Sequence, residues 1–440
     1  MKTYIGMCVL GLALAPAALA QVKPDLYAGL KWRNIGPFRG GRISAVSGSL
    51  TEPGVFYAAA ALGGVWKTVS AGATWFNVTD SVPDIANVTS IAVAPSDSNV
   101  VYIGTGDRGL GVYKSTDAGK TWHHLGLQEN HGVSDILVDP HDANLVLAAT
   151  QGNPHSQNDQ RGVYRSTDGG RGWTRVLYKD NETGAFSMVW AFDNPKVIVV
   201  TMGAHYTPPG QGRSGFRGGT GVVTVYKSSD EGVTWSEVKP AGLPAVGSLA
   251  IAQHTNSQRM YSLGRGGLYR SDDGGANWSL GTNNIYSAGG HVYVDSKNPD
   301  VIYAMGTSSY RSADGGHTLV AFKGAPGGDD PREWWLDPVN PDRILYGGDQ
   351  GATVSLDGGH TWTSWYNQPT AQVYKIGVDN RFPYWVYGSQ QDSGVVGEPV
   401  ERRDLSESPA TARSRARMGS RIHCPRSYRS QHSLYQRQLR

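Results

Sequence analysis

Acidic side chains stand in several loops where two carboxylates could act together on a bound molecule. The loops expected between the second and third strands of repeated units supply Asp107, Asp349 and Asp392. Hydrolysis of a glycosidic bond uses two such groups, about 5–10 Å apart. We therefore take these three aspartates as candidate catalytic residues, with the alternative for each that it caps a turn or is solvated.

A second group of side chains could hold a ligand without reacting with it. Polar and charged residues in loops on the same expected face suit the hydroxyl groups of a sugar or the backbone of a peptide. The candidate ligand-binding residues are Arg39, Arg42, Arg108, Arg265, Asp329, Asp330 and Gln368. We expect Glu333 to lie in one of these loops as well, in a crossover between two units.

No residue pattern indicates a cofactor or a bound metal ion, so we expect neither. Gly104–Gly109 matches a dinucleotide-binding glycine pattern, but it leads into an expected strand, whereas that motif opens a helix. The 12 histidines are scattered along the chain. The adjacent His123 and His124 would point to opposite faces of a strand, which does not make a zinc site.

The net charge of +3 comes from the C-terminal end of the chain. Residues 398–440 contain ten arginines and four acids, which is +6, so the rest of the chain carries −3. A nucleic-acid-binding surface needs a basic patch within the folded part. We therefore expect no nucleic acid partner.

The candidate loops can be placed because one sequence pattern recurs. It reads aromatic, Lys or Arg, Ser, any residue, Asp, any residue, Gly, two further residues and Trp, as in Tyr113–Trp122. Seven copies end at positions 75, 122, 173, 235, 278, 319 and 362. Ser70 replaces Asp in the first copy, and Leu319 replaces Trp in the sixth. The pattern predicts an array of similar structural units.

The aspartates of this pattern are expected to be structural. An Asp side chain accepts hydrogen bonds from nearby backbone N–H groups and fixes a tight turn, in which Gly takes a positive φ. The large Trp packs between neighbouring units. We assign this structural role to Asp117, Asp168, Asp230, Asp273, Asp314 and Asp357.

Each copy lies in a unit with four strand signals, and no segment shows a sustained helical period. In the second unit we expect strands at Val88–Ala94, Val100–Gly104, Val112–Ser115 and Trp122–Leu125. Four strands in every 41 to 62 residues predict an all-β fold, a β-propeller of four-stranded blades. Residues 21–397 would form seven complete blades and the start of an eighth over residues 373–389.

Alternating strand directions divide the loops of each blade between two faces. The repeated turn joins the third and fourth strands, so the turn between the first and second strands shares its face. The other loops and the crossovers lie on the opposite face, where the candidate ligand-binding residues are expected. Loops on that face are freer to carry function.

The first 20 residues have the features of a secretory signal peptide. Lys2 precedes an apolar run, Ile5–Ala15, and Ala18–Ala20 forms a cleavage site with small residues. The apolar run is shorter than the roughly 20 residues that a membrane span needs. We expect a secreted or periplasmic protein without a stable span after cleavage, and the sequence leaves its oligomeric state open.

Residues 398–440 depart from the repeat. They contain no copy of the pattern, no Trp and no Lys. This composition indicates a gene read in a shifted frame, and the alternative is a natural, disordered basic tail. The incomplete eighth blade would leave an open sheet edge. The first seven blades could still close if Lys31–Gly36 pairs with the last complete one.

The repeated pattern resembles the Asp-box, or BNR, repeats of bacterial sialidases, xyloglucanase-type glycoside hydrolases, sortilin and the photosystem II assembly factor. Over residues 30–397 the chain is similar to large exported bacterial BNR-repeat proteins, usually labelled glycosyl hydrolases or sortilin-like. The segments that carry this likeness are Trp32–Arg42, Asn367–Gln372, Asp379–Gly388 and Gln390–Asp392. The resemblance implies an exported propeller that acts on or binds carbohydrate.

One departure separates this chain from xyloglucanases. The resemblance implies a catalytic Asp in the first loop between the second and third strands, and Ala61 stands there. A carbohydrate-active propeller and a non-catalytic propeller that binds a peptide or protein, like sortilin or the assembly factor, therefore both remain open. An acid pair at the mouth would favour the first, and a mouth without one the second.

Resequencing the gene across codons 390–441 tests the interpretation of the tail. If the frame is shifted, a one-base correction will restore repeat sequence after Gly397. An unchanged reading frame would contradict the frameshift and leave residues 398–440 as natural sequence.

Overall fold

The computed structural model of the chain describes residue 29 and residues 34–82, 84–106, 111–206, 223–244, 246–264, 266–285, 290–324, 329–390 and 394–400. The predicted signal peptide and residues 401–440 of the predicted tail lie outside these ranges. By its internal contacts the chain divides into residues 1–35 and residues 36–440, and the architecture below is that of the second unit. Among the described residues no helix is long and apolar enough to cross a membrane.

The all-β prediction is confirmed, because the described residues form antiparallel sheets together with a 3-10 turn, η2 (Gln128–Asn130). The first three sheets contain β1 (Ile43–Gly48), β2 (Phe56–Ala60), β3 (Val65–Thr68) and β4 (Phe76–Asn77); β5 (Val88–Val93), β6 (Val101–Thr105), β7 (Val112–Ser115) and β8 (His123–His124); and β9 (Val133–Val138), β10 (Val146–Thr150), β11 (Gly162–Ser166) and β12 (Thr174–Leu177). The next three contain β13 (Thr183–Ala191), β14 (Asn194–Ala204), β15 (Thr224–Ser228) and β16 (Ser236–Val238); β17 (Ser248–Ile251), β18 (Met260–Gly264), β19 (Gly267–Ser271) and β20 (Ser279–Thr282); and β21 (Val292–Val294), β22 (Ile302–Met305), β23 (Ser309–Ser312) and β24 (Val320–Ala321). Two three-stranded sheets follow, β25 (Pro331–Leu336), β26 (Ile344–Gly348) and β27 (Gly351–Ser355), then β28 (Val373–Val378), β29 (Trp385–Gln390) and β30 (Gly394–Pro399).

The predicted strands of the second unit correspond to β5 to β8, with bounds that differ by at most one residue. The last sheet differs from the prediction, because β30 adds a third strand and runs two residues beyond Gly397. In every sheet the order along the chain is the order of pairing, as in a simple meander.

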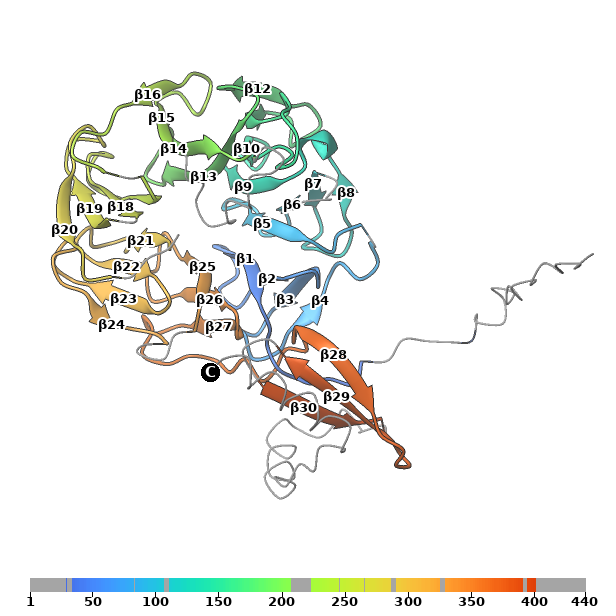
Figure 1. Ribbon diagram of the computed structural model, residues 1–440. Helices are drawn as coiled ribbons and strands as arrows, with labels where there is room; N and C mark the ends of the chain where they lie inside the picture. The colour runs from blue at the N-terminus through green and yellow to red at the C-terminus, as the bar shows by residue number, and fades with distance from the viewer. Residues whose placement is uncertain are drawn as a thin grey trace, which may run out of the picture. The chain divides into compact units, whose positions relative to one another are not determined.

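The first strand of each ring sheet lies on the inside, next to the first strand of the following sheet (Figure 1). Contacts link β1 to β5, β5 to β9, β9 to β13, β13 to β17 and β17 to β21. The Trp334 N–H in β25 donates to the Tyr293 hydroxyl in β21, and β25 lies against β1. These contacts join the described sheets from β1 to β27 into a closed ring.

The repeated turns share one hydrogen-bond pattern, which Asp117 illustrates. The Ser115 hydroxyl donates to Asp117 at 2.8 Å and accepts from the Gly119 N–H at 2.8 Å. Asp117 also accepts from the N–H and the hydroxyl of Thr121, at 2.8 and 2.6 Å. The hydrogen bonds from Thr121 are the largest cause that lowers the pKa of Asp117 to about 2. Equivalent bonds reach Asp168, Asp230, Asp273, Asp314 and Asp357.

The residue after the repeated Asp joins the turn to the rest of its sheet. Ala118 takes a left-handed φ of 59°, and its N–H donates to Asn99 O in the turn between the first two strands, at 2.9 Å. The same bond occurs in all seven copies, for instance from Gly169 to Asn144 O. The two kinds of turn therefore lie on one face of the ring, as predicted.

The carbonyl of that residue ties each turn to the preceding sheet. Lys67 Nζ donates to Ala118 O at 2.9 Å, and Lys114 Nζ donates to Gly169 O at 3.4 Å. Arg165 and Lys227 make the corresponding bonds to the fourth and fifth sheets. The Lys or Arg of the repeat is therefore a link between sheets, a role that the sequence pattern alone does not indicate.

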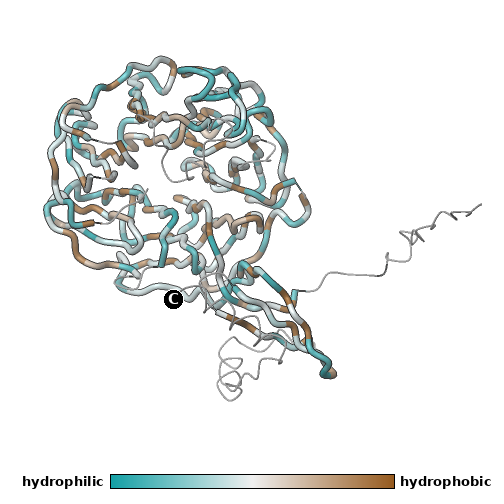
Figure 2. Tube along the Cα trace, viewed as in Figure 1, coloured by the Kyte–Doolittle hydropathy of each residue, from teal (hydrophilic) through white to brown (hydrophobic). Residues whose placement is uncertain are grey.

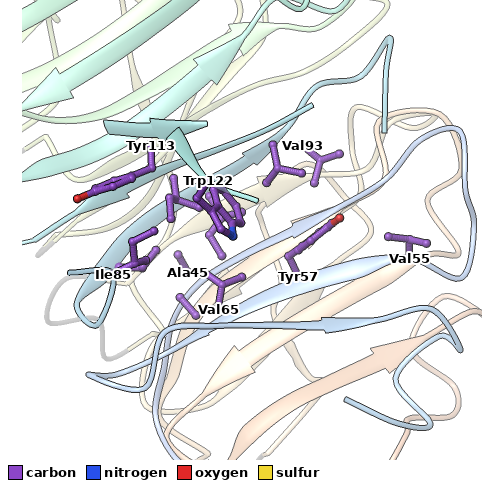
Figure 3. Close-up of a cluster of buried hydrophobic side chains, with 13 residues drawn as sticks. Ala45, Val55, Tyr57, Val65, Ile85, Val93, Tyr113 and Trp122 are labelled. Carbon is purple, nitrogen blue, oxygen red and sulfur yellow. The ribbon is translucent and has the colours of Figure 1, made fainter. Parts of the chain in front are cut away.

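Apolar side chains fill the space between sheets. Between the first and second sheets the buried cluster includes Tyr57, Val93, Tyr113 and Trp122 (Figure 3). The Trp122 indole donates to Val78 O in the first unit at 2.9 Å, so the repeated Trp packs between units as expected. Burying a side chain of this size contributes up to about 4–6 kcal/mol by area, which makes these contacts the main source of cohesion.

Ring closure depends on a buried cation between the seventh and first sheets. The Arg343 guanidinium pairs with Asp337, and both side chains are less than a tenth exposed. It also donates to Ser49 O and Pro53 O, each at 3.0 Å, in the turn after β1. Of the segment Lys31–Gly36, through which we expected closure, Lys31–Arg33 lie outside the described residues and Asn34–Gly36 form no strand, so that closure stays a prediction.

The segment before β1 also holds the closing seam together. The Gly40 N–H donates to Trp365 O at 2.7 Å, and the Gly41 N–H donates to the Thr370 hydroxyl at 3.0 Å. A Cβ at Gly40 would lie 2.3 Å from Gln350 O, so only glycine fits this close approach. Gln368 takes the place of a fourth strand beside β27, because its amide both accepts from and donates to the backbone of Ala352.

Replacing Arg343 with Met should lower the free energy of unfolding by about 3–5 kcal/mol, since Asp337 would keep a buried charge without its partner. Urea denaturation followed by tryptophan fluorescence measures this change. The exposed Lys297→Met is the matched control and should leave the midpoint within error. An equal, small effect of both variants would show that Arg343 does not hold the ring closed.

Candidate functional site

A β-bulge recurs at the same place in the innermost strands. The pairing register shifts around Ser44 in β1, Thr89 in β5, Ser134 in β9, Phe186 in β13 and Arg332 in β25. Bulges re-aim a side chain and are frequent beside functional sites. These positions lie at the end of the strands opposite the repeated turns, which is the face where we predicted a site.

Small hydroxyl residues at the bulges link neighbouring strands. The Ser44 hydroxyl donates to Val88 O at 2.6 Å, and the Thr89 hydroxyl donates to Val133 O at 2.8 Å. The Ser134 hydroxyl continues the series to Ala185 O at 2.7 Å. Each acceptor directly precedes the next bulge, so the hydroxyls form a belt around this part of the ring.

Arg332 replaces the hydroxyl at the seventh sheet and builds a charged cluster. Its guanidinium donates to both carboxylate oxygens of Asp349, at 2.7 and 2.8 Å. Arg42, just before β1, approaches the same carboxylate at 3.8 Å with 41% of its side chain exposed. We call Arg42, Arg332 and Asp349 the seam cluster. It holds one acid between two cations, a geometry that fixes hydrogen-bonding groups in place.

Other predicted ligand-binding residues lie around the seam cluster. The Asp349 N–H donates to Asp330 O at 3.3 Å, which places Asp330 beside the cluster. Asp329 pairs with Lys323 at 3.2 Å, and the Lys323 ammonium lies within 5.3 Å of the Tyr346, Trp362 and Trp365 ring centroids. The Arg39 guanidinium lies over the Tyr366 ring, 5.5 Å from its centroid. Gln368 is buried, and Ala352 engages both of its amide atoms.

Four predicted residues cannot be placed in this way. Asp107, Arg108, Arg265 and Asp392 lie outside the described residues, so their roles stay predictions. Of the three candidate catalytic carboxylates, the structure describes Asp349, in the turn between β26 and β27 where we expected it. Arg332 engages both oxygens of this carboxylate, which makes Asp349 a fixed hydrogen-bonding group of the seam cluster.

Glu333 was expected in a crossover, but it lies inside β25 and immediately follows the bulge. The same register position holds Ala45, Ser90, Asp135 and Ser187 in other innermost strands. Two acids therefore stand on inner strands of different sheets. Alignment of the repeats on their innermost strands could have found this pair, whereas alignment on the repeated turns could not.

Burial raises the pKa values of both inner acids, and the charge of Asp135 also acts on Glu333. Burial raises the pKa of Glu333 well above its usual range, and the charge of Asp135 raises it further. Burial raises the pKa of Asp135 to about 6, although the Met188 N–H donates to its carboxylate at 2.8 Å. The pKa of Tyr293 is raised by burial and by the charges of Glu333 and Asp135. Burial lowers the pKa of His291. The interior of the ring therefore disfavours charge.

The turn between β2 and β3 borders the seam cluster. The Ala61 N–H donates to Arg42 O at 2.8 Å, and Leu62 takes a left-handed φ of 58° and is exposed. Ala61 offers no carboxylate at the position where the resemblance to xyloglucanases implies one. The described residues of this turn hold no acid that could replace it.

A bulged, closed ring of meander sheets with a polar rim defines a β-propeller, and comparison with solved structures confirms that fold. The GH74 xyloglucanase from Xanthomonas campestris superposes with a TM-score of 0.58 at 18% identity, over 82% of this chain and 59% of that chain. YCF48 from Cyanidioschyzon merolae gives a TM-score of 0.51 at 14% identity, over 76% and 100% of the two chains. A structure described as YCF48 bound to D1 peptide also gives 0.51, at 15% identity over 74% and 97%.

Sequence comparisons specify the type of propeller. A family model described as sortilin, neurotensin receptor 3, matches residues 63–205. A xyloglucanase from Paenibacillus sp is 26% identical over 465 aligned residues, which cover 85% of this chain and 44% of that protein. A xyloglucanase from Hypocrea jecorina is 26% identical over 398 residues, covering 79% and 42%. The protein is a sortilin-like and xyloglucanase-like propeller that spans less than half the length of these two relatives.

The raised pKa values of the inner acids predict that stability falls as the pH rises. Over the range from about pH 4 to pH 6 and above, the folded state holds protons that the unfolded state has released, so deprotonation costs folding free energy. Asp135→Asn combined with Glu333→Gln removes the titrating groups. We expect the variant to gain stability over the wild type at pH 8 and to lose most of that gain at pH 4.

Urea denaturation at the two pH values measures this difference. Asp159→Asn on the exposed surface is the control and should leave the pH dependence unchanged. Equal pH slopes for the wild type and the double variant would contradict the pKa assignment.

Proposed function

We propose that this chain is an exported Asp-box propeller of seven blades, with the start of an eighth, that binds carbohydrate at the rim opposite the repeated turns. The observation that carries the proposal is the seam cluster, in which Arg332 holds both oxygens of Asp349 and the partly exposed Arg42 guanidinium lies 3.8 Å from the same carboxylate. Rigid, charged donors and acceptors suit a ligand that offers many hydroxyl groups. The similarity to xyloglucanases supports glucan chains as the class of ligand.

Binding is favoured over hydrolysis for the chain by itself. Ala61 removes one carboxylate that the resemblance implies, and Asp349 is engaged by two arginines. Glycoside hydrolysis needs one carboxyl group to deliver a proton and a second to act as base or nucleophile. Asp107 and Asp392 remain the candidates for such a pair, and the proposal does not depend on them.

A binding measurement with xyloglucan oligosaccharides tests the proposal. Isothermal titration calorimetry of the wild type should give a saturable signal, and Arg42→Met should weaken binding about 10-fold or more, since a lost hydrogen bond to a charged group costs about 1.5–3 kcal/mol. The matched control is Arg171→Met, a repeated-turn arginine on the opposite face, which should bind like the wild type. Equal weakening by both variants, or no binding of any glucan at millimolar concentration, would overturn the proposal.

Peptide binding is the second candidate function. It is favoured by the likeness to the YCF48 structure that contains the D1 peptide, over 74% of this chain. A mixed-charge rim also suits a peptide backbone. Screening the same wild-type and Arg42→Met proteins against a peptide array distinguishes the two functions, because Arg42-dependent capture of peptides without glucan binding would select this one.

A further inference from the structure

One loop on the face of the candidate site is longer than the fold requires. Gln151–Arg161 joins β10 to β11, whereas Asp349 and Gln350 alone make the equivalent turn between β26 and β27. The loop contains no hydrophobic residue, unlike the two strands that it joins, and Figure 2 shows hydrophilic and hydrophobic stretches alternating in this way along the trace. Polar loops that a rigid scaffold holds at its surface are where binding residues concentrate.

A buried cation holds this loop in shape. Arg161 is completely buried, and its Nη2 donates to Asn153 O at 2.5 Å and to Ser156 O at 3.0 Å. The same guanidinium donates to Gln151 O at the start of the loop, and its Nε donates to Asn181 O at 3.0 Å in the crossover that leads to β13. Four backbone carbonyls therefore replace the water that the charged group has lost.

The buried position of this cation is costly. Burial lowers the pKa of Arg161, and the charges of Asp180 and Glu182 counter this effect only in part. The Asn158 N–H also donates to Asn181 O at 3.1 Å, so a second bond ties the loop to the same crossover. The fold therefore keeps a charge that its surroundings disfavour, and what the charge fixes is the conformation of the loop.

The tip of the loop presents His155. The two carbonyls that Arg161 Nη2 binds belong to Asn153 and Ser156, which flank Pro154 and His155 on either side. The His155 N–H donates to the Asn153 side chain at 2.8 Å, which holds the tip from within. His155 is exposed, and its ring makes no hydrogen bond with another described residue. A neutral imidazole both donates and accepts hydrogen bonds, as the recognition of sugar hydroxyl groups requires.

The base of the loop lies at the inner edge of the ring. The Gln151 N–H donates to Gly132 O at 3.1 Å, directly before β9, and a Cβ at Gly184 in β13 would lie 2.6 Å from Gln151 O. Both β9 and β13 are innermost strands, with bulges at Ser134 and Phe186 (Figure 1). The loop therefore starts from the same rim that carries the seam cluster in another part of the ring.

We propose that His155 is a further carbohydrate-contacting residue of this face and that Arg161 is its positioning residue. This inference rests on the function proposed above and adds a second contact to the one at the seam cluster. Because β5 lies between β1 and β9 in the ring, a ligand that touches both places is a chain of several sugar units and not a single sugar. A loop that is fixed before binding loses little conformational freedom when the ligand arrives.

Isothermal titration calorimetry of the full chain with a xyloglucan oligosaccharide tests the contact. His155→Ala should weaken binding about 5- to 10-fold, as the loss of one or two hydrogen bonds to a ligand does. The matched control is His123→Ala, an exposed histidine on β8 at the outer edge of the second sheet, which should bind like the wild type. Circular dichroism should show the wild-type fold for both variants, since both side chains are exposed.

A double-mutant cycle tests the role of Arg161. Arg161→Met should weaken binding about as much as His155→Ala, because the tip loses its fixed position. The two changes together should weaken binding little more than either alone, since Arg161 acts through His155, whereas a general structural defect would add to the loss. Arg161→Lys keeps a cationic donor and should restore part of the affinity, and it replaces Arg161→Met in the cycle if that variant does not fold.

The outcomes separate this inference from the function on which it rests. Binding that Arg42→Met weakens and His155→Ala leaves unchanged would overturn the contact at His155 and leave the proposed function standing. Fully additive losses from His155→Ala and the Arg161 variant would overturn the positioning role of Arg161. A wild-type chain that binds no oligosaccharide at millimolar concentration would overturn the proposed function, and this inference with it.

Discussion

The left-handed residue after each repeated Asp is the point on which the ring depends. Its N–H donates to the turn between the first two strands of its own sheet, and after Asp117, Asp168, Asp230 and Asp273 its C=O accepts from a Lys or Arg of the sheet before. The Asp and Ser side chains hold this peptide group in place from within the turn. This residue thereby connects the repeated turn, the first turn of the same sheet and the third strand of the preceding sheet. Because the connection recurs, it sets the spacing at which the apolar side chains between sheets can pack.

The opposite end of the sheets is less regular, and this difference bears on function. Bulges turn one side chain of several innermost strands toward the neighbouring sheet, and where that side chain is Ser or Thr it only ties strands together. At the seventh sheet the side chain is Arg332, and it gathers Asp349 and Arg42 into a charged group. The same β-bulge therefore links neighbouring strands where its side chain is Ser or Thr, and it builds the candidate site where its side chain is Arg332.

The repeat predicted the sheets, the faces and the place of Asp349, because each of these follows from local turn chemistry that recurs at every copy. Glu333 was placed wrongly, since the boundary between crossover and strand depends on pairing with β26. Asp135 and Arg343 were not found at all. Their roles depend on which sheets become neighbours when the ring closes, and residues almost 200 or 300 positions apart cannot be related by a pattern of about ten residues.

The first copy of the repeat shows how far sequence can drift while the turn persists. Ser70 stands in for Asp, and its hydroxyl still accepts from the Thr74 N–H at 3.1 Å, while the Thr68 hydroxyl accepts from the Gly72 N–H. The turn requires an oxygen acceptor at this position, and it does not require a negative charge. A neutral hydroxyl can therefore replace the acid with little change to the turn. Related propellers can then keep this turn after the Asp by which the motif is usually recognised has been lost.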